Sequence, residues 1–73
     1  MTYCSLGEDS DVSVSRDAKV PRAIVCSWCK LQGGAYDWIA FSEKEMIGHL
    51  LEHRGKGHKV PEDVMERLRE EVP

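Results

Sequence analysis

Two cysteines and two histidines occur in this chain as closely spaced pairs, and no other feature constrains the fold as strongly. Cys26 and Cys29 are separated by two residues, and His49 and His53 by three. A tight turn can aim both thiols at one point, and residues four apart lie on the same face of a helix. Two thiolates and two imidazoles match the ligand set of tetrahedral zinc. We therefore expect these four side chains to bind one structural Zn²⁺ ion.

The length of the chain explains why a metal would be needed. The chain has 73 residues, and domains below roughly 70–80 residues usually need a disulfide, a metal or a partner to support the core. Three cysteines and no secretory leader after Met1 argue against a disulfide framework. We therefore expect a reducing compartment, namely the cytoplasm or the interior of a host cell, with the nucleoid or nucleus as alternatives. No membrane contact is expected, because no apolar run approaches the ~18 residues of a membrane span.

The first half of the chain predicts an arm followed by a hairpin. Residues 1–22 are rich in Ser and Asp and poor in large apolar groups, which predicts a flexible N-terminal arm that could contain a short strand near 12–14. Residues 23–26 and 35–41 are β-type segments on either side of the Gly-Gly pair at 33–34. Two glycines between such segments indicate a tight turn.

The residues after the hairpin predict a helix from 43 to about 54. Ser42 is placed to cap its first turn, and Glu45, three residues later, completes the pattern of a capping box. Gly55 is the expected stop.

A second, amphipathic helix is expected within 59–73, with Pro61 at its first position. Its apolar stripe consists of Val64, Met65, Leu68 and Val72. We prefer the interpretation that this stripe packs on the first helix through Leu50 and Leu51. The alternative is that it binds the groove of a partner.

The order of hairpin and helix, with the ligand pairs on both, resembles the Cys2His2 zinc finger family over about residues 24–58. The resemblance implies a ββα finger, with Phe41 and Met46 in its small core. Ile39, Leu50 and the two tryptophans would add to that core. The central spacing of 19 residues departs from the usual pattern of about 12. We expect the additional residues to enlarge the hairpin around 33–34 or the region of Trp38.

Two further side chains are alternatives at the metal site. His58 follows His53 by five residues, so His53 and His58 could form the histidine pair, although we prefer His49 and His53. Cys4 is expected to be a free thiol in the arm.

Catalytic interpretations are disfavoured. The segment His49-Leu50-Leu51-Glu52-His53 matches an inverted metallopeptidase motif, but the chain is short for a substrate cleft and the cysteines would be unexplained. The Cys26–Cys29 pair could be redox-active, but that chemistry needs a thioredoxin-like βαβ setting. A site closed by four protein ligands leaves no position for reacting water. We expect no enzymatic activity.

Charge and surface composition favour a protein partner over nucleic acid. Ten basic and 13 acidic residues give a net charge of −3, whereas nucleic-acid-binding domains usually carry a basic patch. The helix positions that face bases in the zinc finger family carry no Arg, Asn or Gln; they are Ser42, Lys44, Glu45 and Gly48. Candidate nucleic-acid contacts are Lys44, Arg54, Lys56 and Lys59. Candidate protein contacts are Trp28, Tyr36, Trp38, Met65 and Leu68.

The sequence therefore predicts a small α+β fold: a flexible arm over 1–22, a zinc-stabilised ββα finger over 23–58 and an additional helix over 59–73. The expected function is that of a monomeric, macromolecule-binding zinc module, with a protein-interaction adaptor or regulator first. A weak or partner-assisted DNA-binding transcriptional regulator is second. The compactness of the chain resembles small zinc fingers encoded by phages or other viruses.

Overall fold

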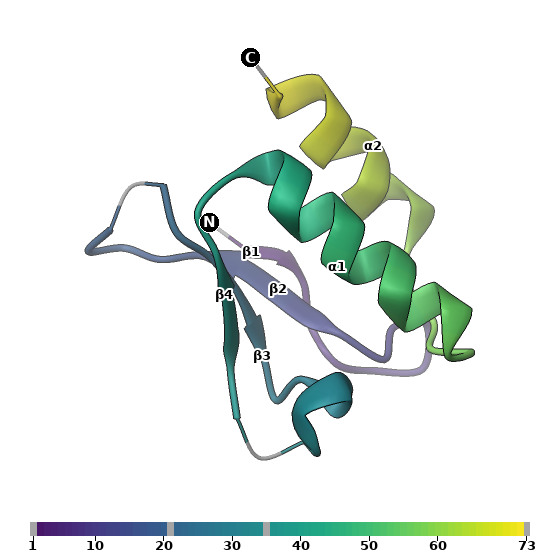
Figure 1. The fold of residues 1–73 in the computed structure, drawn as a ribbon. Coiled ribbons are helices and arrows are strands. Elements are labelled where there is room, and N and C mark those ends of the chain that lie inside the picture. The colour runs from purple at the N-terminus through teal and green to yellow at the C-terminus, as the bar shows by residue number, and fades with distance from the viewer. Residues whose placement is uncertain (1, 21, 35, 73) are drawn as a thin grey trace.

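Four short strands are followed by two helices in the computed structural model, which describes residues 2–20, 22–34 and 36–72 (Figure 1). In chain order the elements are β1 (Thr2–Cys4), β2 (Ser13–Arg16), β3 (Ile24–Ser27), the 3-10 helix η1 (Lys30–Gln32), β4 (Trp38–Ala40), α1 (Glu43–Gly55) and α2 (Glu62–Glu71). The prediction of a small α+β fold is confirmed. Neither helix is long and apolar enough to cross a membrane, as far as the described chain extends.

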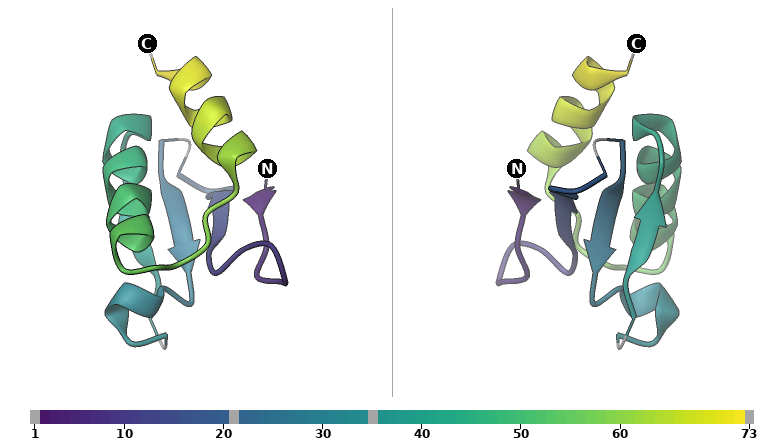
Figure 2. Two further views of the ribbon diagram at one scale, coloured as in Figure 1. Left: turned by 90° about the vertical axis from the view of Figure 1, so that its right-hand side faces the viewer. Right: turned by 90° about the vertical axis from the view of Figure 1, so that its left-hand side faces the viewer.

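The strands form one antiparallel sheet in the order β1-β2-β3-β4. Both helices lie against the same face of this sheet, and no other described element covers the opposite face (Figure 2). Because side chains alternate between the faces of a strand, the inner face carries Val14, Ile24, Cys26 and Ala40, all of them fully buried. The sheet therefore presents one of the two predicted metal-ligating cysteines directly to the helices.

The expectation of a flexible N-terminal arm over 1–22 is wrong. Residues 13–16 pair with β3 in a continuous register from Ser13↔Ser27 to Arg16↔Ile24, and β1 pairs in turn with β2. Val12 and Val14 are completely buried, and Tyr3 nearly so. The physical reason is that Val12, just before β2, and Val14, within it, point to the same side, which gives this otherwise polar segment an apolar face. The expected two-stranded hairpin is thus the half of a four-stranded sheet that carries the cysteines.

Helix α1 begins as its sequence predicts, since the Ser42 hydroxyl accepts a hydrogen bond from the Glu45 amide at 3.1 Å. Its end differs from the prediction, because Gly55 is still helical. Gly57 is the residue that turns into the left-handed region, with φ of 83°. A left-handed glycine beyond the last helical turn is the usual way to reverse the chain at a helix end.

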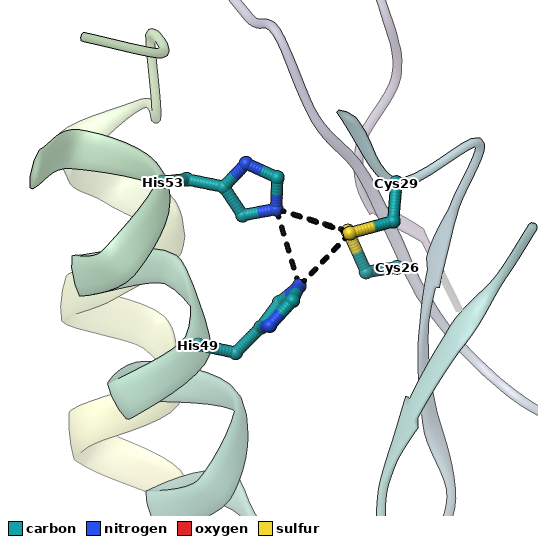
Figure 3. Close-up of side chains that lie close together, drawn as sticks. All are labelled: Cys26, Cys29, His49 and His53. Carbon is teal, nitrogen blue, oxygen red and sulfur yellow. Dashed lines mark hydrogen bonds between the residues drawn. The ribbon is translucent and has the colours of Figure 1, made fainter. Parts of the chain in front are cut away.

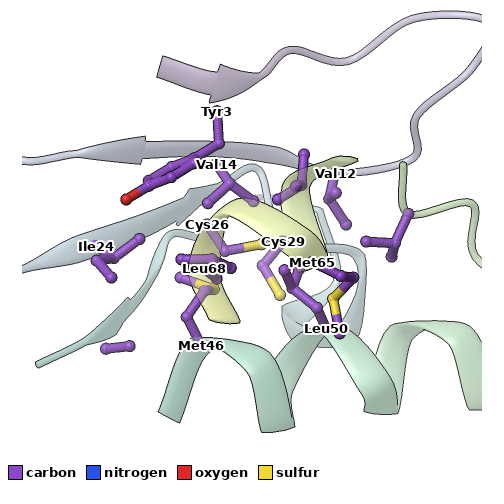
Figure 4. Packing of buried hydrophobic residues seen from close by; sticks show 13 residues of the cluster. Tyr3, Val12, Val14, Ile24, Cys26, Cys29, Met46, Leu50, Met65 and Leu68 are labelled. Carbon is purple, nitrogen blue, oxygen red and sulfur yellow. The ribbon is translucent and has the colours of Figure 1, made fainter. Parts of the chain in front are cut away.

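Helix α2 begins one residue after Pro61 and buries its apolar stripe against the sheet and α1. Val64, Met65 and Leu68 are completely buried, in one cluster with Leu50 of α1 (Figure 4). Leu51, in contrast, is half exposed. The apolar stripe of α2 thus packs on α1, which is the interpretation preferred from the sequence. Of the two leucines expected at this contact, Leu50 takes part and Leu51 does not.

Three of the expected core residues are outside the core. Ile39 and Phe41 are 47% and 61% exposed, and Trp28 is 60% exposed. The pleat of β4 explains the first: Trp38 and Ala40 point toward the helices, so Ile39 points away. Phe41 follows the end of β4 and lines an open hollow with Glu43 and Glu71. Met46 and Leu50 are buried as expected.

Candidate metal centre

The two cysteines are held by the end of β3 and the loop that follows it. Cys26 lies within β3, and Cys29 immediately precedes η1. Trp28, with φ of 53°, turns the chain between them. The Cys29 amide donates to the Tyr36 carbonyl at 3.0 Å, and the Gly34 amide donates to the Cys29 carbonyl at 2.9 Å. The 3-10 turn and the two glycines account for much of the long spacing before α1, as the sequence predicts.

The two histidines project from successive turns of α1 toward these thiols (Figure 3). His49 is 6% exposed, and His53 is completely buried. Both lie on the helix face that also carries Met46 and Leu50. The packing of α1 on the sheet therefore sets the distance between the histidine pair and the cysteine pair.

The distances within the cluster fit a tetrahedral ion. Each residue offers one ligand atom, and these four atoms all lie within 4.8 Å of one another. The Nε2 atom of His53 lies 3.6 Å from Cys26 Sγ, 3.5 Å from Cys29 Sγ and 3.1 Å from His49 Nε2. Cys29 Sγ lies 3.3 Å from His49 Nε2. Zinc bonds of ordinary length imply edges of about 3.6 Å between N and S and about 3.3 Å between two nitrogens. The four residues are thus placed to hold one metal ion, as expected for a structural zinc.

Burial prepares the histidines for this role. It lowers the pKa of His53 to about 4, with further lowering by the neighbouring His49 and His58, and it also lowers the pKa of His49. Both rings are therefore neutral at pH 7, and a neutral ring has a nitrogen lone pair to offer a metal.

Cys26, unlike the two histidines, must lose a proton before it can bind a metal. Burial, followed by the proximity of Cys29, raises the pKa of Cys26 to about 12. A metal binds the thiolate, so binding at neutral pH must displace the Cys26 proton. Metal affinity should consequently rise with pH.

Each ligating histidine is supported by a second ring. Trp38 stacks on His49, with ring centroids 3.9 Å apart and planes only 3° apart. The Nδ1 atom of His53 lies 2.8 Å from Nδ1 of His58. Trp38 is therefore partly buried, with its ring packed against the candidate metal site.

The alternative ligands lie outside the cluster. His58 approaches the far nitrogen of His53 and is not among the four grouped residues. Cys4 contacts the Val12 carbonyl at 3.4 Å and the Ser10 hydroxyl at 3.7 Å. The preferred pair, His49 and His53, is the one that faces the thiols.

The candidate nucleic-acid contacts are not gathered into one basic patch. Arg54 bonds to Glu62 at 2.7 Å and to the Val60 carbonyl at 3.0 Å. The Lys59 ammonium donates to the Glu8 carbonyl at 3.2 Å. Lys44 and Lys56 are exposed near opposite ends of α1.

The candidate protein contacts divide into two groups. Trp28 and Tyr36 are 60% and 71% exposed and flank the cysteine-bearing loop. Met65 and Leu68 are completely buried. Their assignment as surface contacts is wrong, because the sheet and α1 already cover the apolar stripe of α2.

A polar network that the sequence did not predict lies at the other end of the sheet. Arg16 bonds to Glu43 at 2.7 Å and to Glu71 at 2.9 Å, and the Tyr3 hydroxyl donates to Glu71. Its only sequence signal is the alternation of Val12, Val14 and Arg16, which places Arg16 on the inner face of β2. The two carboxylates are too far apart in the chain for any local pattern to connect them.

No model of a known protein family matches the chain, and no curated protein and no solved structure matches it either. The site is consequently described by its own geometry: two buried thiols and two buried imidazoles converge on one point between a sheet and a helix.

Proposed function

We propose that this chain is a zinc-stabilised binding module of the Cys2His2 kind, in which a structural ion fixes a rigid surface for a protein partner. The observation that carries the proposal is the cluster of four buried Cys and His side chains with tetrahedral spacing. Bound zinc would supply structural cross-linking of β3 to α1. Cys26, Cys29, His49 and His53 would hold it.

The proposed role of the ion is structural and not catalytic. Four protein ligands complete a tetrahedral site, whereas catalytic zinc sites keep a position for water or substrate. Glu52, the only candidate base from the metallopeptidase motif, is an exposed residue of α1. We accordingly infer no enzymatic activity. Cys4, Cys26 and Cys29 form no disulfide, which suits a reducing compartment.

The loop that holds the cysteines offers the surface for the partner. Trp28 and Tyr36 expose most of their side chains, and exposed aromatic rings supply much of the contact area in protein interfaces. The loop is tied internally by the bond from the Trp28 amide to Asp37 at 3.1 Å. An aromatic pair on a braced loop loses little conformational entropy when it binds.

The charge arrangement supports protein as the first choice of partner. Arg54 is ion-paired with Glu62 at 2.7 Å, so its charge is already balanced within the chain, and Lys59 donates to the Glu8 carbonyl. The net charge of −3 would also repel a nucleic acid.

A peptide-display library, panned on the zinc-loaded protein, tests this proposal. We expect peptides that bind the wild type and lose at least tenfold in affinity for the double variant Trp28→Ser, Tyr36→Ser. The matched control is Glu66→Ser on the exposed side of α2, which should bind the same peptides as the wild type. Peptides that bind both variants equally, or no enrichment at all, would count against the loop surface.

The second candidate function is DNA binding, favoured by one observation. Lys44 of α1 and Lys56, just after its end, are exposed and line one hollow beside Gly48, although Glu45 and Glu52 line it as well. Titration of a short DNA duplex into the zinc-loaded protein should then shift the amides of Lys44 and Lys56. Those shifts should weaken steeply with salt, because phosphate contacts release counterions. The absence of shifts at near-millimolar duplex would remove this candidate.

A further inference from the structure

The turn after α1 brings His58 back onto the helix that it has just left. Gly57, in the left-handed region, reverses the chain, and its amide donates to the Arg54 carbonyl at 3.0 Å. The His58 amide donates to the carbonyl of His53 at 2.9 Å. This pair of bonds is the Schellman motif, which fixes the residue after the glycine over the third residue from the helix end.

In this turn the two residues that meet are both histidines. An apolar contact frequently accompanies a Schellman motif at these two positions. Here, instead, the His53 and His58 rings lie with centroids 5.1 Å apart and Nδ1 atoms 2.8 Å apart. His58 therefore contacts His53 at two points, through its backbone amide and through its ring.

The chemistry of a metal site determines the direction of the ring-to-ring bond. His53 turns Nε2 toward both sulfurs, so Nε2 is the nitrogen that would bind the ion. A neutral imidazole that binds a metal through Nε2 carries its proton on Nδ1. The Nδ1–H of His53 must then donate, and Nδ1 of His58 must accept.

We propose that His58 is a positioning residue of the metal centre, which accepts the Nδ1–H hydrogen bond of His53 and thereby fixes the tautomer and the orientation of that ligand. Metal-ligating histidines usually need such an outer partner, and its loss typically weakens metal binding about 10- to 100-fold. The proposal rests on metal binding by the four ligands described above. It assigns His58 a role distinct from that of a fifth or substitute ligand.

The test is a zinc competition titration at pH 7 against a chromophoric chelator, with the full chain. His58→Ala is expected to weaken zinc binding about 10- to 100-fold. His58→Asn should bind within about threefold of the wild type, because the amide oxygen of Asn can accept the same bond. The control is Lys56→Ala, an exposed change in the same turn that removes no contact to His53.

A second measurement reports the bond itself. In protein labelled with ¹⁵N-histidine, the Nδ1 proton of His53 should be visible and protected from exchange in the zinc-loaded wild type. It should also be protected in His58→Asn. It should exchange rapidly in His58→Ala.

The outcomes distinguish failure of the metal site from failure of the positioning role of His58. If the wild type binds no zinc, the metal site itself is wrong. If the wild type binds zinc, and His58→Ala binds equally well with a protected Nδ1 proton, only the role of His58 is overturned. If His58→Ala and His58→Asn both lose zinc as completely as His53→Ala, His58 is a ligand and the positioning role is overturned. Should His58→Ala not fold, His58→Asn decides, because a loss beyond tenfold contradicts the proposal.

Discussion

The two ends of the layer between the sheet and the helices are closed in different ways. At one end, near the last turns of α1, four buried ligands from β3, its loop and α1 converge on one point. At the other end, Arg16 links β2 to the first turn of α1 and the last turn of α2, and Tyr3 of β1 joins it through Glu71. We refer to these as the metal end and the ionic end.

The difference lies in how completely water is excluded. The Arg16, Glu43 and Glu71 side chains remain 23%, 18% and 32% exposed, so solvent screens their attraction. Partly exposed ion pairs contribute at most about 1 kcal/mol each. Structural zinc sites of the finger type contribute about 10–16 kcal/mol. The comparison teaches that the ionic end aligns elements that the core already stabilises, whereas an ion bound at the metal end would add stability that this small core lacks.

Removing the metal is expected to have the largest effect. A chelator, or His53→Ala, should abolish native-like amide chemical shifts over 23–58, since about 10–16 kcal/mol is comparable with the whole stability of a small domain. Glu52→Ala, the exposed neighbour of His53, is the control and should leave the spectrum unchanged. A zinc-free protein with near-native shifts would show that the core alone suffices.

A substitution in the hydrophobic core, which lies between the two ends, should have the next largest effect on stability. Leu50→Ala removes a completely buried side chain and should reduce the free energy of unfolding of the zinc-loaded protein by about 2–5 kcal/mol. Leu51→Ala, at the next position but 50% exposed, should change it by less than about 0.5 kcal/mol. Denaturant unfolding followed by circular dichroism measures both. Equal losses would contradict the packing of α1.

Breaking the ionic end should have a smaller effect. Arg16→Met removes both ion pairs and should cost about 1 kcal/mol after allowance for screening, with zinc affinity unchanged. Arg69→Met, which removes only a 3.7 Å pair between exposed groups, is the matched control. Unfolding midpoints at equal zinc concentration compare the two variants. A loss of zinc affinity in Arg16→Met would show that the two ends are coupled.

The smallest effect is a pair of shifts in carboxyl titration. The bond from Arg16 holds the pKa of Glu43 below its ordinary 4.5, and the bond from the Tyr3 hydroxyl, with help from Arg16, does so for Glu71. Because the folded pKa is depressed, this stabilisation is present above pH 4.5 and is lost as the pH falls through the folded pKa. Carboxyl ¹³C titration of the wild type should therefore give midpoints below 4.5 for both groups.

Two variants separate the causes of these shifts. Arg16→Met should return the pKa of Glu43 toward 4.5, whereas Tyr3→Phe should raise the pKa of Glu71 and leave Glu43 unchanged. Equal movement of both carboxyls in Tyr3→Phe would mean that the network responds as one unit.

The metal end could be predicted from the sequence almost entirely, because its determinants are local. The spacing of each ligand pair is a property of one turn or one helix face, and the Ser42 cap fixes where that helix begins. Which side chains of β4 face the helices could be predicted less well. Ala40 and Phe41 are adjacent, and only the pairing of β4 with β3 decides that the small residue faces the helices.

The ionic end could not be predicted because its partners are distant in the chain. Val12 and Val14 lie in a segment whose composition is that of a flexible arm, and pairing with distant strands orders it. Asp11 adds a further long-range link, since its carboxylate accepts from the Lys59 amide at 2.6 Å. A contact between residues tens of positions apart leaves no periodic pattern in a single sequence.

The bond between Tyr3 and Glu71 has a consequence for the order in which the protein assembles during synthesis. This contact spans 68 positions, whereas Cys26 and His53 at the metal end are only 27 positions apart. Closing a longer loop costs more entropy, and a ribosome releases the chain from its N-terminus. All four ligands are synthesised before residue 71 is added, and the loop between Cys26 and His53 is the shorter one to close, so we expect the metal end to form before Tyr3 meets Glu71.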